Sequence, residues 1–338
     1  MTKRSAWAWL KMLAGAGILT ALLWHMGTGA FLDGLRTIDA GTLLAALALG
    51  LLTTVFSAWR WCLVARGLGL RLPLGQAVAD YYRALFLNAA LPGGVLGDVH
   101  RAVGHGRDEG DVARGIRAVV LERAAGQLVL LVAGVVVLLA DPSPVLARVG
   151  HALTTPGAEL LAALVCGLLI ATAGWLSWSG GTSRAGRMVR GTLAEARRAL
   201  LTRAAFPGIA LSSLVVLAGY LGMFLLAARV AGATAPAAEL VPLMVLALLA
   251  MALPLNIGGW GPREGVAAWA FGTAGLGAPQ GLATSVVYGV LAFVAGLPGA
   301  AVLLVRWAAG LRADRAGRPQ VEFEERVLAE GVAAQRRT

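Results

Sequence analysis

The sequence predicts an all-α protein, a polytopic membrane helical bundle with six full spans and two re-entrant, broken-helix segments. Composition is the first observation, since 58% of the 338 residues are hydrophobic, 14% are charged and the mean hydropathy is +0.74. A soluble domain has about 25% charged residues, so this chain has too little polar surface to be one. The second is the presence of apolar runs of the roughly 20 residues that a membrane-spanning helix needs. The third is a pair of apolar runs that Pro and Gly interrupt.

The six predicted spans follow the apolar runs. They cover approximately residues 6–27, 42–64, 115–140, 157–178, 207–229 and 279–307. The arginine-rich residues 183–204 suit an amphipathic helix on the membrane surface. We expect two parts, an integral membrane domain over residues 1–310 and a charged cytoplasmic tail over 311–338.

The distribution of basic residues predicts the orientation. Most of the 29 Lys and Arg residues fall in connections on the side of the N-terminus, and such an excess marks the cytoplasmic side of a membrane protein. Both termini are therefore expected in the cytoplasm. The net charge of +11 is attributed to this excess and not to nucleic-acid binding, because the basic residues lie between apolar runs and not on one soluble module.

The two broken stretches are residues 74–101 and 238–276. Pro removes a backbone donor and Gly relaxes the backbone, and non-helical backbone at membrane depth must be buried in protein or line a wet cavity. We expect each stretch to enter and leave on one side, the first from inside and the second from outside. Two interrupted segments in corresponding halves are typical of a transporter site between inverted repeats, which we hold as a hypothesis. The alternative is eight plain spans.

Polar residues in and near the breaks are the expected binding site, because ionisable side chains within a bilayer face a cavity or a partner. The candidate substrate-binding residues are Asn88, Gly93, Gly94, Asp98, Arg101, Glu122, Arg123, Asn256, Gly258, Gly259, Arg263 and Glu264. A helix N-terminus beside an arginine, as expected at Arg263, suits a phosphate.

Several of these polar residues have a structural alternative. Glu122 with Arg123, and Asp80 with Arg83, are interpreted either as site residues or as pairs that fix helix ends. Asn88 and Asn256 either donate to a headgroup or cap broken backbone. The Trp59-Arg60-Trp61 sequence is interpreted as an interfacial belt of aromatic residues with a cation.

The sequence offers little for an enzyme. Cys62 and Cys166 have no metal-binding spacing and the four histidines are scattered. There is no zinc-protease motif, no Walker phosphate loop, no nucleophile with its base and no pair of carboxylates suited to acid/base work. We therefore expect no enzyme activity, no metal and no cofactor.

The motifs occur in a recognisable order. Asn88 is followed by Pro92-Gly93-Gly94, Asp98 and Arg101, then by Glu122-Arg123, and then by Pro254, Gly258-Gly259 and Arg263-Glu264. Over about residues 10–310 this order resembles the lysylphosphatidylglycerol synthase transmembrane (flippase-like) family. The resemblance implies a multi-pass protein of a bacterial-type inner (plasma) membrane that is linked to moving lipids between leaflets. Full-length synthases add a soluble aminoacyl-transferase domain, for which this sequence has no room, so synthesis of a lysyl lipid is not expected.

These observations predict a membrane lipid flippase or transporter. It would move a phosphate-bearing headgroup, aminoacylated or not, between leaflets, with membrane lipid as its partner and no nucleic acid. The alternative is a non-transporting accessory or lipid-binding protein that serves a lipid-synthesis enzyme for glycolipids or isoprenoid lipids. An intramembrane transferase is disfavoured because the sequence supplies no base.

Overall fold

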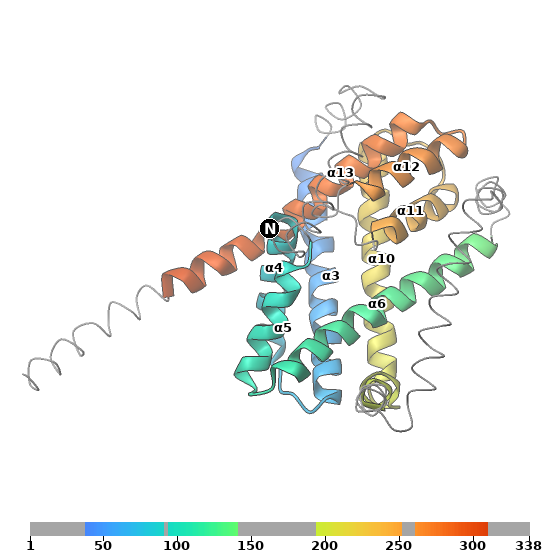
Figure 1. The fold of residues 1–338 in the computed structure, drawn as a ribbon. Coiled ribbons are helices and arrows are strands. Elements are labelled where there is room, and N and C mark those ends of the chain that lie inside the picture. The colour runs from blue at the N-terminus through green and yellow to red at the C-terminus, as the bar shows by residue number, and fades with distance from the viewer. Residues whose placement is uncertain (1–37, 91–93, 141–193, 252–260, 310–338) are drawn as a thin grey trace, which may run out of the picture.

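The computed structural model describes residues 38–90, 94–140, 194–251 and 261–309, in which helices form the regular structure and no strand occurs. This confirms the all-α prediction for the described residues; the predicted spans at 6–27 and 157–178 lie outside them. The main helices are α3 (Ala40–Gly67), α4 (Leu74–Ala90), α5 (Leu96–Asp108), α6 (Val112–Ala140), α10 (Phe206–Val230), α11 (Ala237–Met251), α12 (Pro262–Thr273) and α13 (Ala278–Gly296), shown in Figure 1.

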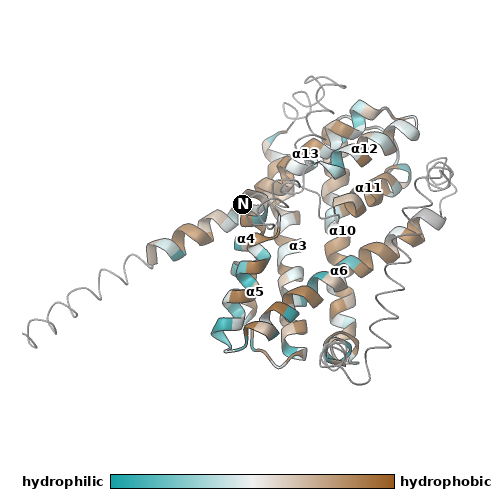
Figure 2. Cartoon of the chain, in the orientation of Figure 1, coloured by the Kyte–Doolittle hydropathy of each residue, from teal (hydrophilic) through white to brown (hydrophobic). Residues whose placement is uncertain are grey.

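Four helices of the described part are long and apolar enough to cross a membrane: α3, α6, α10 and α13, the last extended to Ala309. They coincide with four predicted spans. Figure 2 shows hydrophobic residues along most of their length. On α6, the side chains of Leu131, Val132 and Val136 are more than half exposed, as expected for a surface that lipid covers. Asp39 caps α3 by accepting a hydrogen bond from the Thr42 amide at 2.7 Å, and the Thr42 hydrogen bonds lower the pKa of the Asp39 carboxyl.

Each predicted break corresponds to a pair of short helices. The first pair is α4 with 17 residues and α5 with 13, and the second is α11 with 15 and α12 with 12. At 1.5 Å per residue these helices are about 25 Å long or less, whereas the hydrocarbon core is about 30 Å thick. None of the four is therefore long enough to cross a bilayer alone.

The two ends of each short-helix pair lie together. Before α4, the Arg71 amide donates to Glu109 Oε2, just after α5, at 3.3 Å. Gln280, near the start of α13, donates from Nε2 to the Ala231 carbonyl, just after α10, at 2.7 Å. Each pair of short helices therefore begins and ends at the same level of the bundle.

The two pairs start at opposite ends of the bundle, because α3 and α10 are antiparallel. Gly208, at the start of α10, packs beside Leu63, near the end of α3, and Gly219 packs beside Thr53. The α4–α5 pair follows the end of α3, and the α11–α12 pair follows the end of α10 (Figure 1).

Helix contacts in one half of the described chain recur in the other. Both halves have the order long, short, short, long, as α3–α6 and as α10–α13. Each extensive helix contact has an equivalent in which every helix is replaced by the matching helix of the other half. For example, α5 packs on α6 as α12 packs on α13, and α4 meets α13 as α11 meets α6. The α3–α10 contact joins the two halves, and because α3 and α10 are matching helices, exchanging the halves leaves it unchanged.

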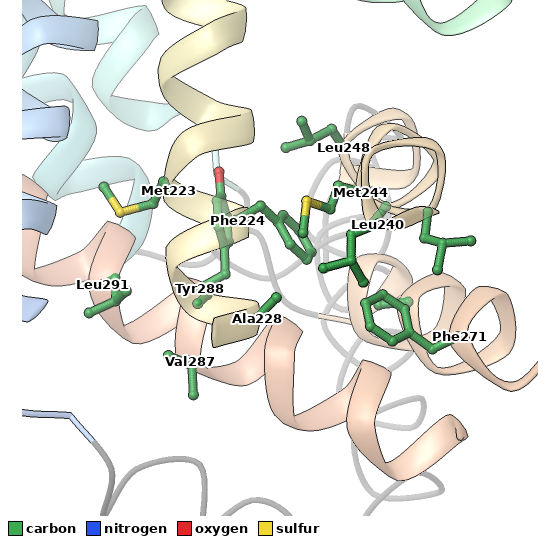
Figure 3. Close-up of a cluster of buried hydrophobic side chains, with 14 of the residues drawn as sticks. Met223, Phe224, Ala228, Leu240, Met244, Leu248, Phe271, Val287, Tyr288 and Leu291 are labelled. Atoms are coloured by element: carbon green, nitrogen blue, oxygen red, sulfur yellow. The ribbon is translucent and has the colours of Figure 1, made fainter. Parts of the chain in front are cut away.

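A buried apolar cluster holds the second half together (Figure 3). The rings of Phe224 on α10 and Tyr288 on α13 stack with centroids 4.6 Å apart. Met244 of α11 and Phe271 of α12 are also fully buried in this cluster. Since lipid is as apolar as these side chains, the close packing itself stabilises the contact.

Candidate functional site

The first ionic cluster is centred on Glu122 of α6, which is fully buried. Its Oε1 accepts from Nε and Nη2 of Arg60 on α3, at 3.1 and 2.6 Å. Its Oε2 accepts from Nη2 of Arg101 on α5 at 2.7 Å. Tyr81 of α4 adds its hydroxyl, which donates to Oε1 at 3.3 Å. One carboxylate thus connects four helices of the first half.

Asp98, the third residue of α5, is the second carboxylate of this cluster. Its Oδ1 accepts from Nε of Arg101 at 2.8 Å, and Nη2 of Arg123 on α6 lies 2.9 and 2.8 Å from its two oxygens. Asn88, at the end of α4, donates from Nδ2 to Asp98 Oδ2 at 3.1 Å. Asp98 is therefore bound on one side by Asn88 at the helix break and on the other by Arg123 of α6.

Arg101 lies at the centre of the cluster with its side chain fully buried. Its guanidinium carbon lies 4.6 Å from the ring centroid of Trp61 and 4.5 Å from that of Tyr81, a cation–π arrangement. Its Nη1 is buried and has no hydrogen-bond partner within the described part of the chain. A buried guanidinium with an unused donor is costly, so this group is suited to an additional acceptor.

The first ionic cluster, defined as Arg60, Asp98, Arg101, Glu122 and Arg123, has three guanidiniums and two carboxylates. Its fixed charges therefore sum to one positive charge. The side chains of Glu122 and Arg101 are fully buried, whereas the side chain of Arg123 is 36% exposed. Arg123 is the most exposed member of the cluster.

Two interpretations of the sequence are wrong in this region. Glu122 and Arg123 do not pair with each other, because successive helix residues point about 100° apart; Glu122 binds Arg60 and Arg101, and Arg123 binds Asp98. Arg60 and Trp61 do not form an interfacial belt, since both are buried.

The first break is held by side-chain and backbone contacts. Asn88 Oδ1 accepts from the Gly97 amide at 2.8 Å. The Asn88 side chain therefore caps the broken backbone, which is one of the two roles predicted for it. Gly94 has a φ of 63°, the left-handed region that favours glycine. Gly97 lies so close to α4 that a Cβ would be 2.2 Å from the Ala84 carbonyl oxygen. Gly93 lies outside the described residues.

The second ionic cluster, Arg263, Glu264 and Ser285, joins α12 to α13. Glu264 Oε1 accepts from Arg263 and, at 3.1 Å, from the Ser285 hydroxyl. Glu264 Oε2 accepts from the Gly261 amide at 2.7 Å and so caps α12. The Arg263 guanidinium lies 4.9 Å from the ring centroid of Tyr288. Asn256, Gly258 and Gly259 lie outside the described residues.

Asp80 and Arg83 of α4 do meet as their spacing predicts, with 3.1 Å between Nη2 and Oδ1. Arg306, which is 226 residues away in sequence and was not expected there, donates from Nη1 to the same Asp80 oxygen at 2.7 Å. This third cluster lies where α4 and α13 meet.

Sequence reasoning also missed several partners. These are Arg60, Tyr81, Ser213, Ser285 and Tyr288. One signal was available: Thr53, Ser57 and Arg60 recur three or four residues apart in an apolar helix, which places them on one face. All three are buried. No group of three His, Cys, Asp or Glu side chains able to hold a metal occurs among the described residues.

Long apolar helices around buried ionic clusters define a multi-pass α-helical membrane protein. The chain belongs to the family described as the lysylphosphatidylglycerol synthase TM region, whose profile matches residues 8–299. This confirms the resemblance drawn from the motifs. No curated protein and no solved structure matches the chain.

Proposed function

We propose that this protein is a lipid flippase or transporter that moves a phosphate-bearing headgroup between leaflets. The observation that carries the proposal is the surplus positive charge of the first ionic cluster, together with the unused Arg101 Nη1 and the partly exposed Arg123. Charge placed this deep in an apolar protein is costly and usually functional. A phosphodiester carries the single negative charge that would neutralise it.

Arginine suits this ligand. A guanidinium presents several N–H donors in a plane, which match two phosphate oxygens at once, and such charge-assisted hydrogen bonds are about twice as strong as neutral ones. The headgroup would reach Arg123 first and then the donor of Arg101. For an aminoacylated headgroup the amine would need a carboxylate, and Asp98, whose side chain is 16% exposed, is more accessible than the fully buried Glu122.

We further propose that α4–α5 and α11–α12 are re-entrant hairpins in an inverted repeat. The hydrogen bonds that join the ends of each pair support entry and exit on one side. Two observations support halves of opposite orientation: α3 and α10 are antiparallel, and the helix contacts of one half recur in the other. In such transporters, movement of one half against the other exposes a central site to each face in turn. Six full spans, a plasma membrane location and cytoplasmic termini belong to the same proposal.

The test is headgroup exchange in vesicles that contain the purified full-length protein and a fluorescent phosphatidylglycerol. A reductant that cannot cross the membrane bleaches the outer leaflet, and exchange is measured as further bleaching. Arg123→Gln should slow exchange by about tenfold or more, because it removes the accessible charge-assisted hydrogen bonds to phosphate.

Arg114→Gln is the matched control, since Arg114 also pairs with an aspartate, Asp111, but is 45% exposed and belongs to no buried cluster. It should exchange lipid at the wild-type rate. Wild-type exchange by Arg123→Gln would overturn the assignment of the site. Lipid that copurifies with the wild type without any leaflet exchange would favour the accessory, lipid-binding function over transport.

A further inference from the structure

The cluster at the contact between α4 and α13 has no role in the proposed headgroup site. Asp80 is buried, and both guanidiniums approach its Oδ1, Arg306 at 2.7 Å and Arg83 at 3.1 Å. Two positive charges therefore share one carboxylate at ion-pair distance, and Asp108 acts on Arg83 from farther away. Each guanidinium has five N–H donors; within the described residues both pair with Asp80, and the Arg306 side chain is 42% exposed.

Apolar side chains surround the exposed arginine. Leu304, Val305 and Trp307, its neighbours in sequence, are 63%, 69% and 66% exposed. Tryptophan and arginine with an apolar stem are typical of the level at which lipid headgroups meet the acyl chains. The exposed apolar side chains next to this cluster suit contact with acyl chains, and the arginines suit contact with a headgroup.

In the part of the other half that the structure describes, the equivalent contact is apolar around its glycine. There α6 meets α11 through Gly134 beside Val245 and Leu249. In the α4–α13 contact, close approach is likewise provided by a glycine, because a Cβ on Gly299 would lie 2.1 Å from the Tyr82 carbonyl oxygen. Glycine therefore provides the close approach at both contacts, and Asp80, Arg83 and Arg306 are an additional feature of the α4–α13 contact.

We propose that Arg83 and Arg306 form a second anion site, which binds the phosphate of a membrane phospholipid at the α4–α13 contact. The site is separate from the first ionic cluster and does not depend on transport. Asp80 lies between the two guanidiniums and neutralises one of them, and the net positive charge of these three residues attracts an anionic lipid from the surrounding leaflet. The acyl chains lie along Leu304, Val305 and Trp307.

The experiment is photocrosslinking of the full-length protein in phosphatidylcholine nanodiscs that contain a minor fraction of diazirine-tailed phosphatidylglycerol. Peptide mapping should find the crosslink at residues 304–307. The Arg83→Gln/Arg306→Gln double variant should lower its yield by about tenfold, since two charge-assisted contacts are lost. Arg114→Gln, an arginine with the same spacing to its aspartate, should leave the yield unchanged.

The Asp80→Asn variant separates a binding site from a purely structural contact. It removes the carboxylate that competes with phosphate, so the crosslink should persist or increase. A loss of crosslink in Asp80→Asn, or an undiminished crosslink in the double variant, would overturn the proposal. Unlabelled phosphatidylglycerol should compete; equal competition by glycerol 3-phosphate would assign the site to soluble phosphate esters and overturn the lipid assignment.

Discussion

The two short-helix pairs share an architecture but differ in charge. In both, the second short helix has an acid as its third residue, Asp98 in α5 and Glu264 in α12, and in both that acid contacts the following long helix. Asp98 belongs to a cluster with an excess of arginine. Glu264 is paired with the arginine that precedes it in sequence.

The difference in charge is the basis for proposing a binding role for the first cluster and a structural role for the second. Glu264 uses both oxygens within the fold, one to cap α12 through the Gly261 amide and one to hold Arg263 and Ser285. The first ionic cluster, in contrast, keeps a buried donor on Arg101 without a partner in the described residues and a partly exposed Arg123. The same helical frame thus holds a closed ionic contact in one half and, in the other, the arginine-rich cluster that we propose as an anion site.

Loss of the central carboxylate should have the largest effect on stability. Glu122→Gln leaves the buried Arg60 and Arg101 without their shared negative charge, and breaking a buried ion pair costs about 3–5 kcal/mol. Glu264→Gln breaks one buried pair, with Arg263, and not two, so its cost should lie toward the lower end of the same range. Unfolding of purified protein in mixed micelles with increasing SDS measures both. A larger loss for Glu264→Gln would reverse the comparison.

A smaller effect is expected from the glycine contacts that let the short helices approach their neighbours. Gly97→Ala forces a Cβ toward the Ala84 carbonyl and should cost about 1–3 kcal/mol through overpacking. Gly281→Ala should behave alike, because a Cβ there would lie 2.3 Å from the Ala267 carbonyl oxygen. Gly104→Ala, on the same helix as Gly97 but with no neighbouring atom within 4 Å, is the control and should be neutral or slightly stabilising. Equal stability of Gly97→Ala and Gly104→Ala would contradict the close packing.

The long helices were predictable because a membrane span is a local property of composition and length. The same holds for Asp80 with Arg83, whose spacing of three places them on one face of a helix. The positions of both breaks also followed from local Pro and Gly clusters, since these residues interrupt helices wherever the chain folds.

The partners of the buried charges were not predictable in this way. Glu122 binds Arg60 and Arg101, which are 62 and 21 residues away in sequence, so the pairing depends on how four helices pack. Arg60 was misread because a Trp-Arg-Trp sequence looks the same at a membrane surface and in a bundle interior. Only the shared polar face of Thr53, Ser57 and Arg60 indicated that Arg60 lies in the bundle interior and not at the membrane surface.

We propose that the two short-helix pairs open on opposite faces of the membrane, and the accessibility of single cysteines tests this topology. In a cysteine-free background, Leu74→Cys and Asp108→Cys report on the ends of the α4–α5 pair, and Thr234→Cys and Pro279→Cys report on those of the α11–α12 pair. A thiol reagent that cannot cross the membrane should label the first two from one face and the second two from the other. Labelling of the two ends of either pair from opposite faces would contradict this topology.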